Sequence, residues 1–400
     1  MRILIFQDRN QLKNTGGPTG YLYNISEYLK QHPVEEITFL DMSRIHETPF
    51  SKLISFFTYG LISVLKKCHI LQIWPLIFSN FIWCRRFTKD TINYLNSFDA
   101  IHVHSVPSMH FSFKRNKVKG KLILTTHCPE PVTDEMTGAL CLEKFMKSHS
   151  QLREWLLKKE IEAFDICDFV MFPVAQAREP YENASYIYKE KFSEINDKFF
   201  YVPTALGSIE KIDKNNHILD SYHIPNSALR LCYVGRHTQV KGYDFLQKTA
   251  IKVWDILPDT RFIIGGKEAP LKGLSDNRWL ELGWVNTAEL LNEVDAFILP
   301  NKNTYFDLIL LEVLRQGTPV LLSRTGGNKW FEDMHLEGMK FFEYGNDKEL
   351  VDCIKEIRVL KDAGRLDSVK ESNRKYCQDE FNMGLYLKRY LEAITTISKK

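Results

Sequence analysis

The stretch LRLCYVGRHTQVKGYDFLQKTA, residues 229–250, contains the pattern that decides the fold. Its apolar run Leu229–Val234 has the length of a buried strand, and the polar residues that follow are bounded by Gly235 and Gly242. From Tyr243 onward the apolar residues have helical spacing. A strand, a glycine-bounded loop and a helix in this order form the unit from which parallel sheets with helices on both faces are built.

The same alternation of apolar runs and helix-length segments extends through both halves of the chain. In the first half the runs are Ile3–Phe6, Glu36–Leu40, Ala100–His104, Lys121–Thr126, Phe169–Val174 and Phe199–Val202. In the second half they are Leu229–Val234, Arg261–Ile264, Leu280–Leu282, Ala296–Leu299, Pro319–Leu322 and Lys340–Tyr344. Short strands separated by helices indicate parallel sheets. We therefore expect an α/β fold of two Rossmann-like, doubly wound domains that face each other across a cleft.

A polar, irregular segment between residues 205 and 228 separates the two series of strands. Its asparagines and its proline are typical of a linker between domains. The expected organisation is an N-terminal domain over residues 1–205, a C-terminal domain over 206–380 and a final helix over 381–400. Apolar residues in that segment have the spacing of a helical apolar face. We expect this helix to cross over and pack back on the N-terminal domain.

The composition excludes several classes of protein. The chain has 400 residues, of which 44% are apolar, and this is enough for a core in each of two domains. Its 53 Lys and Arg against 50 Asp and Glu leave a formal net charge of +3, so bulk charge does not indicate nucleic-acid binding. The eight cysteines match no metal spacing and favour buried thiols in a reducing compartment. No signal-peptide pattern follows Met1, and we expect a cytoplasmic protein.

Loops that follow the strands of a parallel sheet are where ligands bind in such folds. The first of these loops in the second half contains Arg236 and Lys241. These two cations are able to neutralise a diphosphate together, the arginine by paired hydrogen bonds and the lysine as a point charge. The alternative interpretation is two solvated surface cations.

Two further loops in the second half have features suited to a nucleotide. A strand meets a helix at Gly283–Thr287, where the backbone either reads the edge of a base or forms a plain turn. In the next loop and its helix, Glu312 lies among apolar residues, and a ribose diol is a fitting partner for its carboxylate unless it faces solvent. The first turn of that helix, near Phe306, supplies free amides for an anion. Gly326 and Gly327 would let a phosphate approach the backbone.

From Tyr233 to Trp330 the order and spacing of these motifs resemble the retaining nucleotide-sugar glycosyltransferases of family 4, glycosyl transferases group 1, which have the GT-B fold. The residues that carry the resemblance are Gly235-Arg236, Lys241-Gly242, Gly283, Glu312, Gly317-Thr318-Pro319-Val320 and Gly326-Gly327. In the first domain the resemblance is diffuse and rests on Gly16-Gly17, His102, His104, Thr126-His127 and Phe169–Val174.

The resemblance implies a role for each residue that matches. Arg236 and Lys241 would bind the donor diphosphate and stabilise the leaving nucleoside diphosphate, and Glu312 would hold the ribose. His127 would lie at the reacting centre near the acceptor, although a hydrogen-bonded histidine at a strand end remains an equal alternative. The backbone positions implied to face the donor are Gly16, Gly17, Gly235, Gly283, Val285, Phe306, Asp307, Leu308, Gly326 and Gly327.

The chain departs from the family pattern at one position. Thr304 stands where the family has the first of two glutamates, which usually binds hydroxyls of the donor sugar. Asp307 is the nearest carboxylate, at a helix start where the family usually has glycine. It either accepts hydrogen bonds from the sugar or serves only as a favourable acid in a first helical turn. An anion beside a diphosphate is also repulsive, which puts the identity of the donor in question.

The segment 49–89 is basic and aromatic, with no acidic residue between Glu47 and Asp90. Its uncharged runs are too short and too polar for a membrane-spanning helix. Two interpretations remain open: an amphipathic surface that rests on an anionic membrane leaflet, or a pair of core helices.

The expected function is that of a retaining hexosyltransferase that needs no metal, since the chain has no Asp-x-Asp motif. It would move a sugar from a nucleotide diphosphate sugar, with UDP the most frequent nucleotide in the family, to a hydroxyl of a glycan or lipid-linked acceptor. Bacterial surface glycan assembly at the inner face of the membrane is the expected setting. No cofactor and no nucleic acid is expected. The alternative is a catalytically silent GT-B partner subunit that binds a glycan or another transferase.

Overall fold

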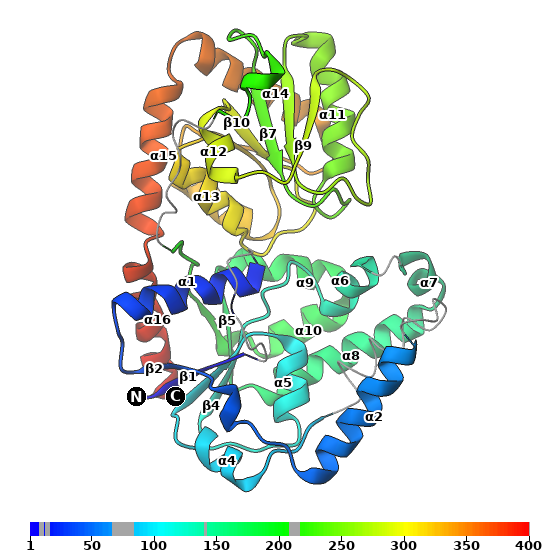
Figure 1. The fold of residues 1–400 in the computed structure, drawn as a ribbon, viewed down its shortest axis with the longest axis vertical. Helices are drawn as coiled ribbons and strands as arrows, with labels where there is room; N and C mark the ends of the chain where they lie inside the picture. Colours follow the sequence, from blue (N-terminus) through cyan, green and yellow to red (C-terminus); the bar gives the residue numbers. More distant parts are fainter. Residues whose placement is uncertain (8–11, 13–16, 66–83, 140–141, 208–216, 400) are drawn as a thin grey trace. The chain divides into compact units, whose positions relative to one another are not determined.

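A computed structural model describes residues 1–7, 12, 17–65, 84–139, 142–207 and 217–399. The chain forms two compact units (Figure 1). Unit 1 comprises Met1–Pro173, Pro180–Pro203 and Leu387–Lys400, and unit 2 comprises Val174–Glu179 and Thr204–Tyr386. The short segment Val174–Glu179 therefore belongs to unit 2, although it lies inside the first half of the sequence.

Unit 1 contains a six-stranded parallel sheet in the order β2-β1-β3-β4-β5-β6. The strands are β1 (Ile3–Phe6), β2 (Ile37–Phe39), β3 (Ala100–Val103), β4 (Lys121–Leu124), β5 (Phe169–Phe172) and β6 (Phe199–Tyr201). The central strands β1, β3 and β5 are buried over their whole length, because helices cover both faces of a parallel sheet. The direction of strand order reverses between β1 and β3, and the loops after these two strands border the expected position of a ligand.

The helices of unit 1 connect these strands. They are α1 (Gly17–Gln31), α2 (Pro49–Leu65), α4 (Lys89–Leu95), α5 (Val106–Phe113), α6 (Val132–Ala139), α7 (Glu143–Ser148), α8 (Ser150–Ile166), α9 (Glu179–Ala184) and α10 (Tyr186–Glu194), of which α9 begins at the boundary with unit 2. None of the helices in the described part of the chain combines the length and the apolar character needed to cross a bilayer.

Unit 2 contains a second six-stranded parallel sheet, in the order β12-β11-β10-β7-β8-β9. Its strands are β7 (Arg230–Val234), β8 (Arg261–Gly265), β9 (Trp279–Gly283), β10 (Ala296–Leu299), β11 (Val320–Ser323) and β12 (Met339–Phe342). Its helices are α11 (Tyr243–Ile256), α12 (Thr287–Asn292), α13 (Leu308–Gln316), the 3₁₀ segment η7 (Gly326–Met334), α14 (Asp347–Asp362), α15 (Leu366–Glu380) and the first part of α16 (Met383–Ser398). The strand order reverses between β7 and β10.

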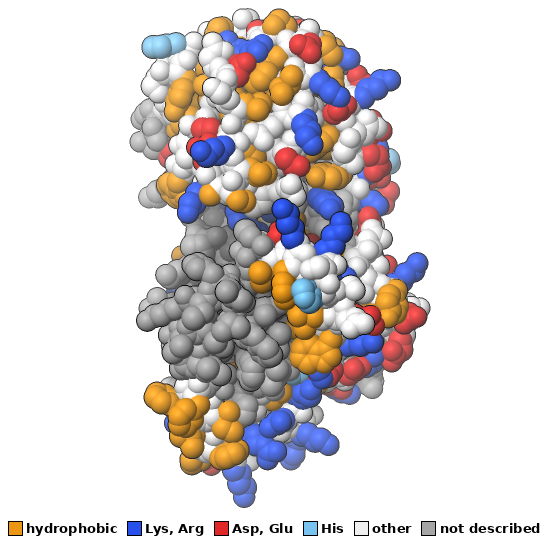
Figure 2. Space-filling view, turned by 90° about the vertical axis from the view of Figure 1, so that its right-hand side faces the viewer, with side chains coloured by type: hydrophobic (Ala, Val, Ile, Leu, Met, Phe, Trp, Pro, Cys, Tyr) orange, Lys and Arg blue, Asp and Glu red, His pale blue; other side chains and the backbone are white. Residues whose placement is uncertain are grey.

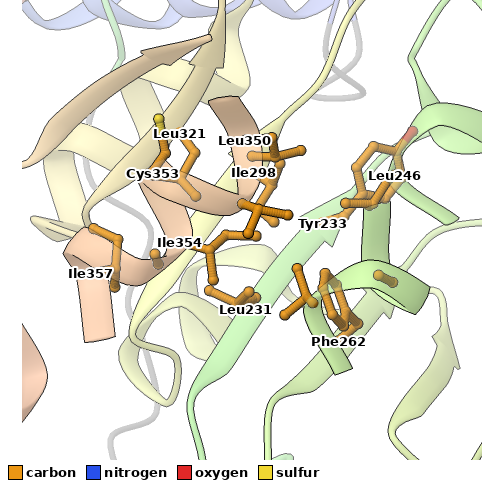
Figure 3. Packing of buried hydrophobic residues seen from close by; sticks show 14 of the residues in the cluster. Leu231, Tyr233, Leu246, Phe262, Ile298, Leu321, Leu350, Cys353, Ile354 and Ile357 are labelled. Carbon is orange, nitrogen blue, oxygen red and sulfur yellow. The ribbon is translucent and has the colours of Figure 1, made fainter. Parts of the chain in front are cut away.

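The core of unit 2 explains why the sequence alternates as it does. Alternate residues of the central strands, such as Leu231, Tyr233 and Ile298, point to one face of the sheet and are almost completely buried (Figure 3). Leu246 of α11 and Ile354 of α14 pack against them from the helical layer. Each apolar run that predicted a strand overlaps one, and the expected fold of two doubly wound α/β units is confirmed.

The last helix, α16, links the two units in sequence. Its residues from Leu387 onward belong to unit 1, where Tyr390 and Ile394 are buried. The cysteines of the described residues are free, and all of them except the partly exposed Cys128 are buried. Cys68 and Cys141 lie outside the described residues.

Candidate functional site

The candidate site in unit 2 lies where the strand order reverses. The loop after β7 contains Arg236 and Lys241, and the loop after β10 contains residues 300–307. Because β7 and β10 are neighbours in the sheet and run parallel, both loops leave the same edge side by side. This is the position where doubly wound sheets bind their ligands.

Two backbone features fix the loops against each other. Gly242 has a φ of +69°, and a Cβ atom at this position would lie 1.7 Å from the carbonyl oxygen of Pro300. The N–H of Lys302 donates to the carbonyl of Val240 over 2.9 Å. A glycine is therefore required at 242, and the close approach of the two backbones places Lys241 beside the start of α13.

The loop after β11 completes this arrangement. A Cβ atom on Gly327 would lie 2.0 Å from the carbonyl oxygen of Tyr305, so this loop packs directly on the 300–307 loop. The hydroxyl of Thr325 donates to the carbonyl of Lys302 over 3.0 Å. Gly326 is buried and begins η7. The glycine pair is thus needed for close packing of two loops.

The two predicted cations differ in their surroundings. The Nζ atom of Lys241 lies 3.0 Å from Oδ2 of Asp307, and both side chains are about one-fifth exposed. Arg236 is exposed and forms no ion pair with any described residue. The hydroxyl of Tyr233 donates to the carbonyl of Arg236 over 2.7 Å and holds its backbone in place. A free guanidinium on a fixed backbone is suited to an anionic ligand.

The start of α13 is a second feature suited to an anion. The helix begins at Leu308, two residues later than the expected start near Phe306, because Asp307 has extended backbone angles of φ −72° and ψ 124°. Asp307 occupies the N-cap position, but its carboxylate accepts no hydrogen bond from the first turn. No side chain of the N-cap residue therefore covers the positive end of the helix dipole, although the N–H of Leu310 donates to the carbonyl of Asp307 over 3.1 Å.

Two polar atoms in the same loop are buried without a partner. Thr304 and Asn301 are completely buried, and Oγ1 of Thr304 and Oδ1 of Asn301 have no hydrogen-bond partner among the described residues. Buried polar atoms are normally satisfied, so exceptions at a strand end point to a missing water or ligand. Sequence reasoning missed Asn301, although its position two residues after the end of β10 marks it as a candidate, because ligands bind at the carboxyl ends of strands.

The other residues predicted to bind the sugar donor lie in α13 and in the loops after β7, β8 and β9. Glu312 lies half-buried in α13 between the buried residues Leu311 and Val313. Gly283 ends β9 with a φ of +70°, and its carbonyl accepts from the N–H of Gly266 over 2.7 Å. The loops after β7, β8 and β9 are linked in turn, because a Cβ atom on Gly266 would lie 2.1 Å from the carbonyl oxygen of Gly235.

The β9 loop carries the two residues expected to border a base. Val285 packs against Gly265, where an added Cβ atom would lie 2.8 Å from its Cγ2. Trp284, between the two predicted positions, is 90% exposed.

Unit 1 has its own pocket, of about 430 Å³, at the carboxyl ends of β1, β3 and β4. His104 and His127 line it, and their rings are joined by a hydrogen bond of 2.9 Å between Nδ1 of His104 and Nε2 of His127. Tyr21 packs on the ring of His127 at a centroid distance of 4.8 Å. Gly17 begins α1 with a φ of +59°, whereas Gly16 lies outside the described residues.

The histidines of this pocket are neutral at physiological pH. Burial lowers the pKa of His127 to about 3 and also lowers the pKa of His104 well below its usual value. A neutral imidazole has one donor and one acceptor nitrogen, so the histidine pair can position a hydroxyl but does not add charge to the pocket. The backbone of His127 is left-handed, with a φ of +57°, a conformation that is costly for this residue type.

Comparisons with known proteins give both a family match and structural neighbours. Residues 228–358 match the family model described as glycosyl transferases group 1. No curated protein sequence matches the chain. Sucrose-phosphate synthase from Thermosynechococcus elongatus is similar in structure, with a TM-score of 0.62 and 14% identity over 99% of this chain and 98% of that one.

Two further solved structures cover the whole chain. Anabaena HepE in complex with UDP has a TM-score of 0.56 and 12% identity over 99% of this chain and 100% of that one. The lipopolysaccharide outer core galactosyltransferase WaaB has a TM-score of 0.55 and 14% identity over 99% of each chain. Residues 228–358 thus match the glycosyl transferases group 1 family model, and the fold of the whole chain is that of the GT-B glycosyltransferases.

Proposed function

We propose that this chain transfers a sugar from a nucleotide diphosphate sugar to an acceptor hydroxyl. The observation that carries the proposal is the convergence of Arg236, Lys241 and the N-terminus of α13 at the reversal point of the second sheet. Two cations and the N-terminus of a helix that no N-cap side chain covers, all at one point, are suited to a diphosphate. UDP is the proposed nucleotide, since HepE has been solved with UDP-glucose and with UDP.

The proposed reaction breaks the bond between the anomeric carbon and the diphosphate oxygen and forms a bond from that carbon to the acceptor oxygen. Arg236 and Lys241 stabilise the negative charge that develops on the leaving diphosphate, as preorganised charges do in other transfer reactions. The leaving diphosphate takes the acceptor proton on the same face of the sugar, which gives retention of configuration. No step requires a metal, since the two cations and the helix amides neutralise the leaving group.

The acceptor is proposed to bind in unit 1, in the pocket that His104 and His127 line. The hydrogen-bonded histidine pair supplies neutral donor and acceptor atoms for a hydroxyl. Glu135 and Ser108 line the same pocket and offer further polar groups for a sugar. This proposal keeps His127 as the residue nearest the reacting hydroxyl.

A lipid-linked acceptor at the membrane is proposed because of α2. Hydrophobic side chains gather in the lower part of Figure 2, beside a group of Lys and Arg. On α2, Phe50, Leu53 and Phe56 are between 53% and 74% exposed. Arg86 and Arg115 line a pocket of about 390 Å³ with Phe50, and a lipid phosphate is a suitable ligand for these two guanidiniums. Residues 66–83 of the predicted membrane segment lie outside the described residues.

Flotation of the protein with anionic and neutral vesicles tests the membrane proposal. We expect salt-sensitive recovery with the anionic vesicles, and loss of this recovery in the Phe50→Ser/Phe56→Ser variant. Ile256→Ser, which changes an exposed apolar residue of α11, is the matched control. Equal recovery of the variant and the wild type, or no recovery with either kind of vesicle, would contradict membrane contact through α2.

Calorimetry against a panel of nucleoside diphosphates tests the donor proposal. We expect one nucleoside diphosphate of the panel, most of all UDP, to bind the wild-type protein. We expect the Arg236→Ala/Lys241→Ala variant to lose that binding. A folded protein that binds none of them would instead favour the second candidate, a catalytically silent partner of another transferase. Thr304, which supplies a hydroxyl where the family has a carboxylate, is the observation that favours this second candidate.

A further inference from the structure

One carboxylate in the unit 2 site already occupies the place of an anionic ligand. Oδ2 of Asp307 lies 3.0 Å from Nζ of Lys241 and also accepts a hydrogen bond from the side-chain amide of Asn301. Asn301 is completely buried, and Asp307 is about one-sixth exposed. The carboxylate is therefore held from two sides inside the site and is not a loosely solvated surface acid.

The backbone explains why Asp307 takes this position. As the N-cap residue of α13, Asp307 would ordinarily turn its carboxylate to the amides of the first turn. Its side chain makes no such bond and contacts Lys241 and Asn301 instead. Since the approach of Gly242 to Pro300 fixes Lys241 beside this helix start, the lysine is the nearest cation for the carboxylate.

The ion pair between Lys241 and Asp307 lowers the net positive charge of the site. Arg236 forms no ion pair with a described residue, whereas the charge of Lys241 is compensated by Asp307. A diphosphate that binds Lys241 has to replace Asp307 as its counter-ion, or else bind next to an uncompensated carboxylate. Either event weakens the hold of the site on any polyanion.

We propose that Asp307 lowers the affinity of the donor site for phosphate groups, as an internal counter-ion of Lys241 that the diphosphate must displace. This inference rests on the proposed donor site and assigns a role to a residue that the family pattern would not place there. Its consequence is a site that binds a free nucleoside diphosphate less tightly than its two cations alone would allow. The leaving group is then released more readily after transfer.

The test compares the affinity of UDP for the wild type and for Asp307→Asn by calorimetry. Asparagine keeps an oxygen that can accept from Asn301 and Lys241, so the substitution removes the charge and keeps the shape. We expect UDP to bind about fivefold more tightly, which corresponds to about 1 kcal/mol, the order of a partly exposed ion pair. Uridine, which has no phosphate, is expected to bind both proteins equally.

Asp259→Asn is the matched control. Asp259 pairs with Arg358 over 2.9 Å and lies two residues before β8, at the amino-terminal end of the strands and away from the site. This variant has the same net charge as Asp307→Asn, so it reports any effect of overall charge on UDP affinity. An equal gain in affinity in both variants would overturn the assignment to Asp307.

A double-mutant cycle with Lys241→Ala distinguishes displacement of Asp307 from Lys241 from simple repulsion between Asp307 and the diphosphate. If Asp307 acts by occupying Lys241, the gain from Asp307→Asn becomes smaller in a Lys241→Ala background, because there is no lysine left to release. An equal or larger gain in that background would show that Asp307 only repels the diphosphate, and would overturn the proposal. An unchanged affinity in the single variant would overturn it as well.

The affinity for inorganic pyrophosphate tests the role of Asp307 without relying on the proposed function. If no nucleoside diphosphate binds the wild type, the donor proposal fails, but the charge argument still predicts tighter pyrophosphate binding by Asp307→Asn than by Asp259→Asn. Nucleotide binding without any response to Asp307→Asn would leave the donor proposal standing and contradict the counter-ion role. The two failures are thus distinguishable.

Discussion

The hydroxyl of Tyr390 lies 3.0 Å from Nδ1 of His102, although 288 positions separate the two residues. On the other side of the ring, Nε2 of His102 lies 2.8 Å from the hydroxyl of Thr125, which itself donates to the carbonyl of Met171. The hydroxyl hydrogen of Thr125 is already donated to the carbonyl of Met171. The oxygen of Thr125 therefore accepts from Nε2–H of His102, and Nδ1 of His102 accepts from the hydroxyl of Tyr390. One neutral tautomer thus ties the final helix to the sheet of unit 1.

We predict that Tyr390→Phe lowers the free energy of unfolding by about 1–3 kcal/mol, since it leaves the buried Nδ1 of His102 without a donor. Urea denaturation measures this loss. Tyr222→Phe, which removes the hydroxyl of an exposed tyrosine of unit 2, is the control and should change stability little. If both variants unfold at the wild-type urea concentration, the bond from Tyr390 does not stabilise the protein.

A second prediction concerns pH and Glu160 on α8, which is completely buried and accepts a hydrogen bond of 2.5 Å from the hydroxyl of Tyr188. Burial raises the pKa of Glu160 from its usual 4.5 to about 7. The folded state therefore favours the protonated carboxyl. Its contribution to stability is complete below about pH 4.5 and is lost as the pH rises to about 7.

In Glu160→Gln this loss, about 3 kcal/mol between pH 4.5 and pH 7, should disappear. The measurement is the free energy of unfolding of wild type and variant at several pH values, and the slope of their difference is the readout. Because the readout is the pH dependence of this difference, a loss of stability that is the same at every pH does not affect the result. The exposed Glu35→Gln is the control, and a parallel pH dependence of wild type and Glu160→Gln would refute the prediction.

The cations of unit 2 are predicted to stabilise the transition state in addition to binding the diphosphate. Arg236→Ala or Lys241→Ala should lower kcat/KM by a factor that corresponds to a loss of about 2–4 kcal/mol of transition-state stabilisation. This is the range for removal of one preorganised charge-stabilising group. Lys248→Ala, an exposed cation on α11 of the same unit, should have no effect. Activity within a few-fold of wild type in both site variants would remove these residues from the mechanism.

Glu312→Ala is predicted to weaken nucleotide binding and to change kcat less than KM, because a ribose contact is made equally in the ground state and the transition state. Calorimetry with UDP and with inorganic pyrophosphate distinguishes this role. The variant should lose affinity for UDP but not for pyrophosphate. An equal loss for both ligands would instead indicate that the substitution disturbs α13.

Thr304→Glu restores the carboxylate that the family pattern has at this position. If the donor sugar lies against Thr304, whose hydroxyl is buried without a described partner, the variant should change the order of preference among UDP-sugars. Competition between pairs of donors in one reaction measures this order. An unchanged order with full activity would place the sugar elsewhere.

The sequence predicted the strands and the loops of the site for one physical reason. Parallel strands buried on both faces must be apolar throughout, and the polar residues that follow each strand then collect at one edge of the sheet. Arg236, Lys241 and Asp307 were therefore expected near one another. The helical apolar pattern after Phe381 also predicted the final helix, but it does not say on which unit Leu387–Lys400 packs.

The contacts that define the chemistry were not predictable in the same way. The pairing of Lys241 with Asp307 depends on the close packing of Gly242 on Pro300, which no local pattern encodes. The burial of Glu160 was missed because a glutamate in a helix normally faces solvent. The placement of Val174–Glu179 in unit 2 depends on packing between distant segments, which periodicity does not reveal.

The central claim is glycosyl transfer, and transfer of label from radiolabelled UDP-sugars to a panel of lipid-linked, glycan and protein acceptors tests it most directly. We predict that one donor and acceptor pair is labelled by the wild type, and that labelling falls at least a hundredfold in Arg236→Ala/Lys241→Ala, about the loss expected from removing charge stabilisation. A wild-type protein that binds UDP yet labels no acceptor, or labels one equally well without both cations, would contradict the account.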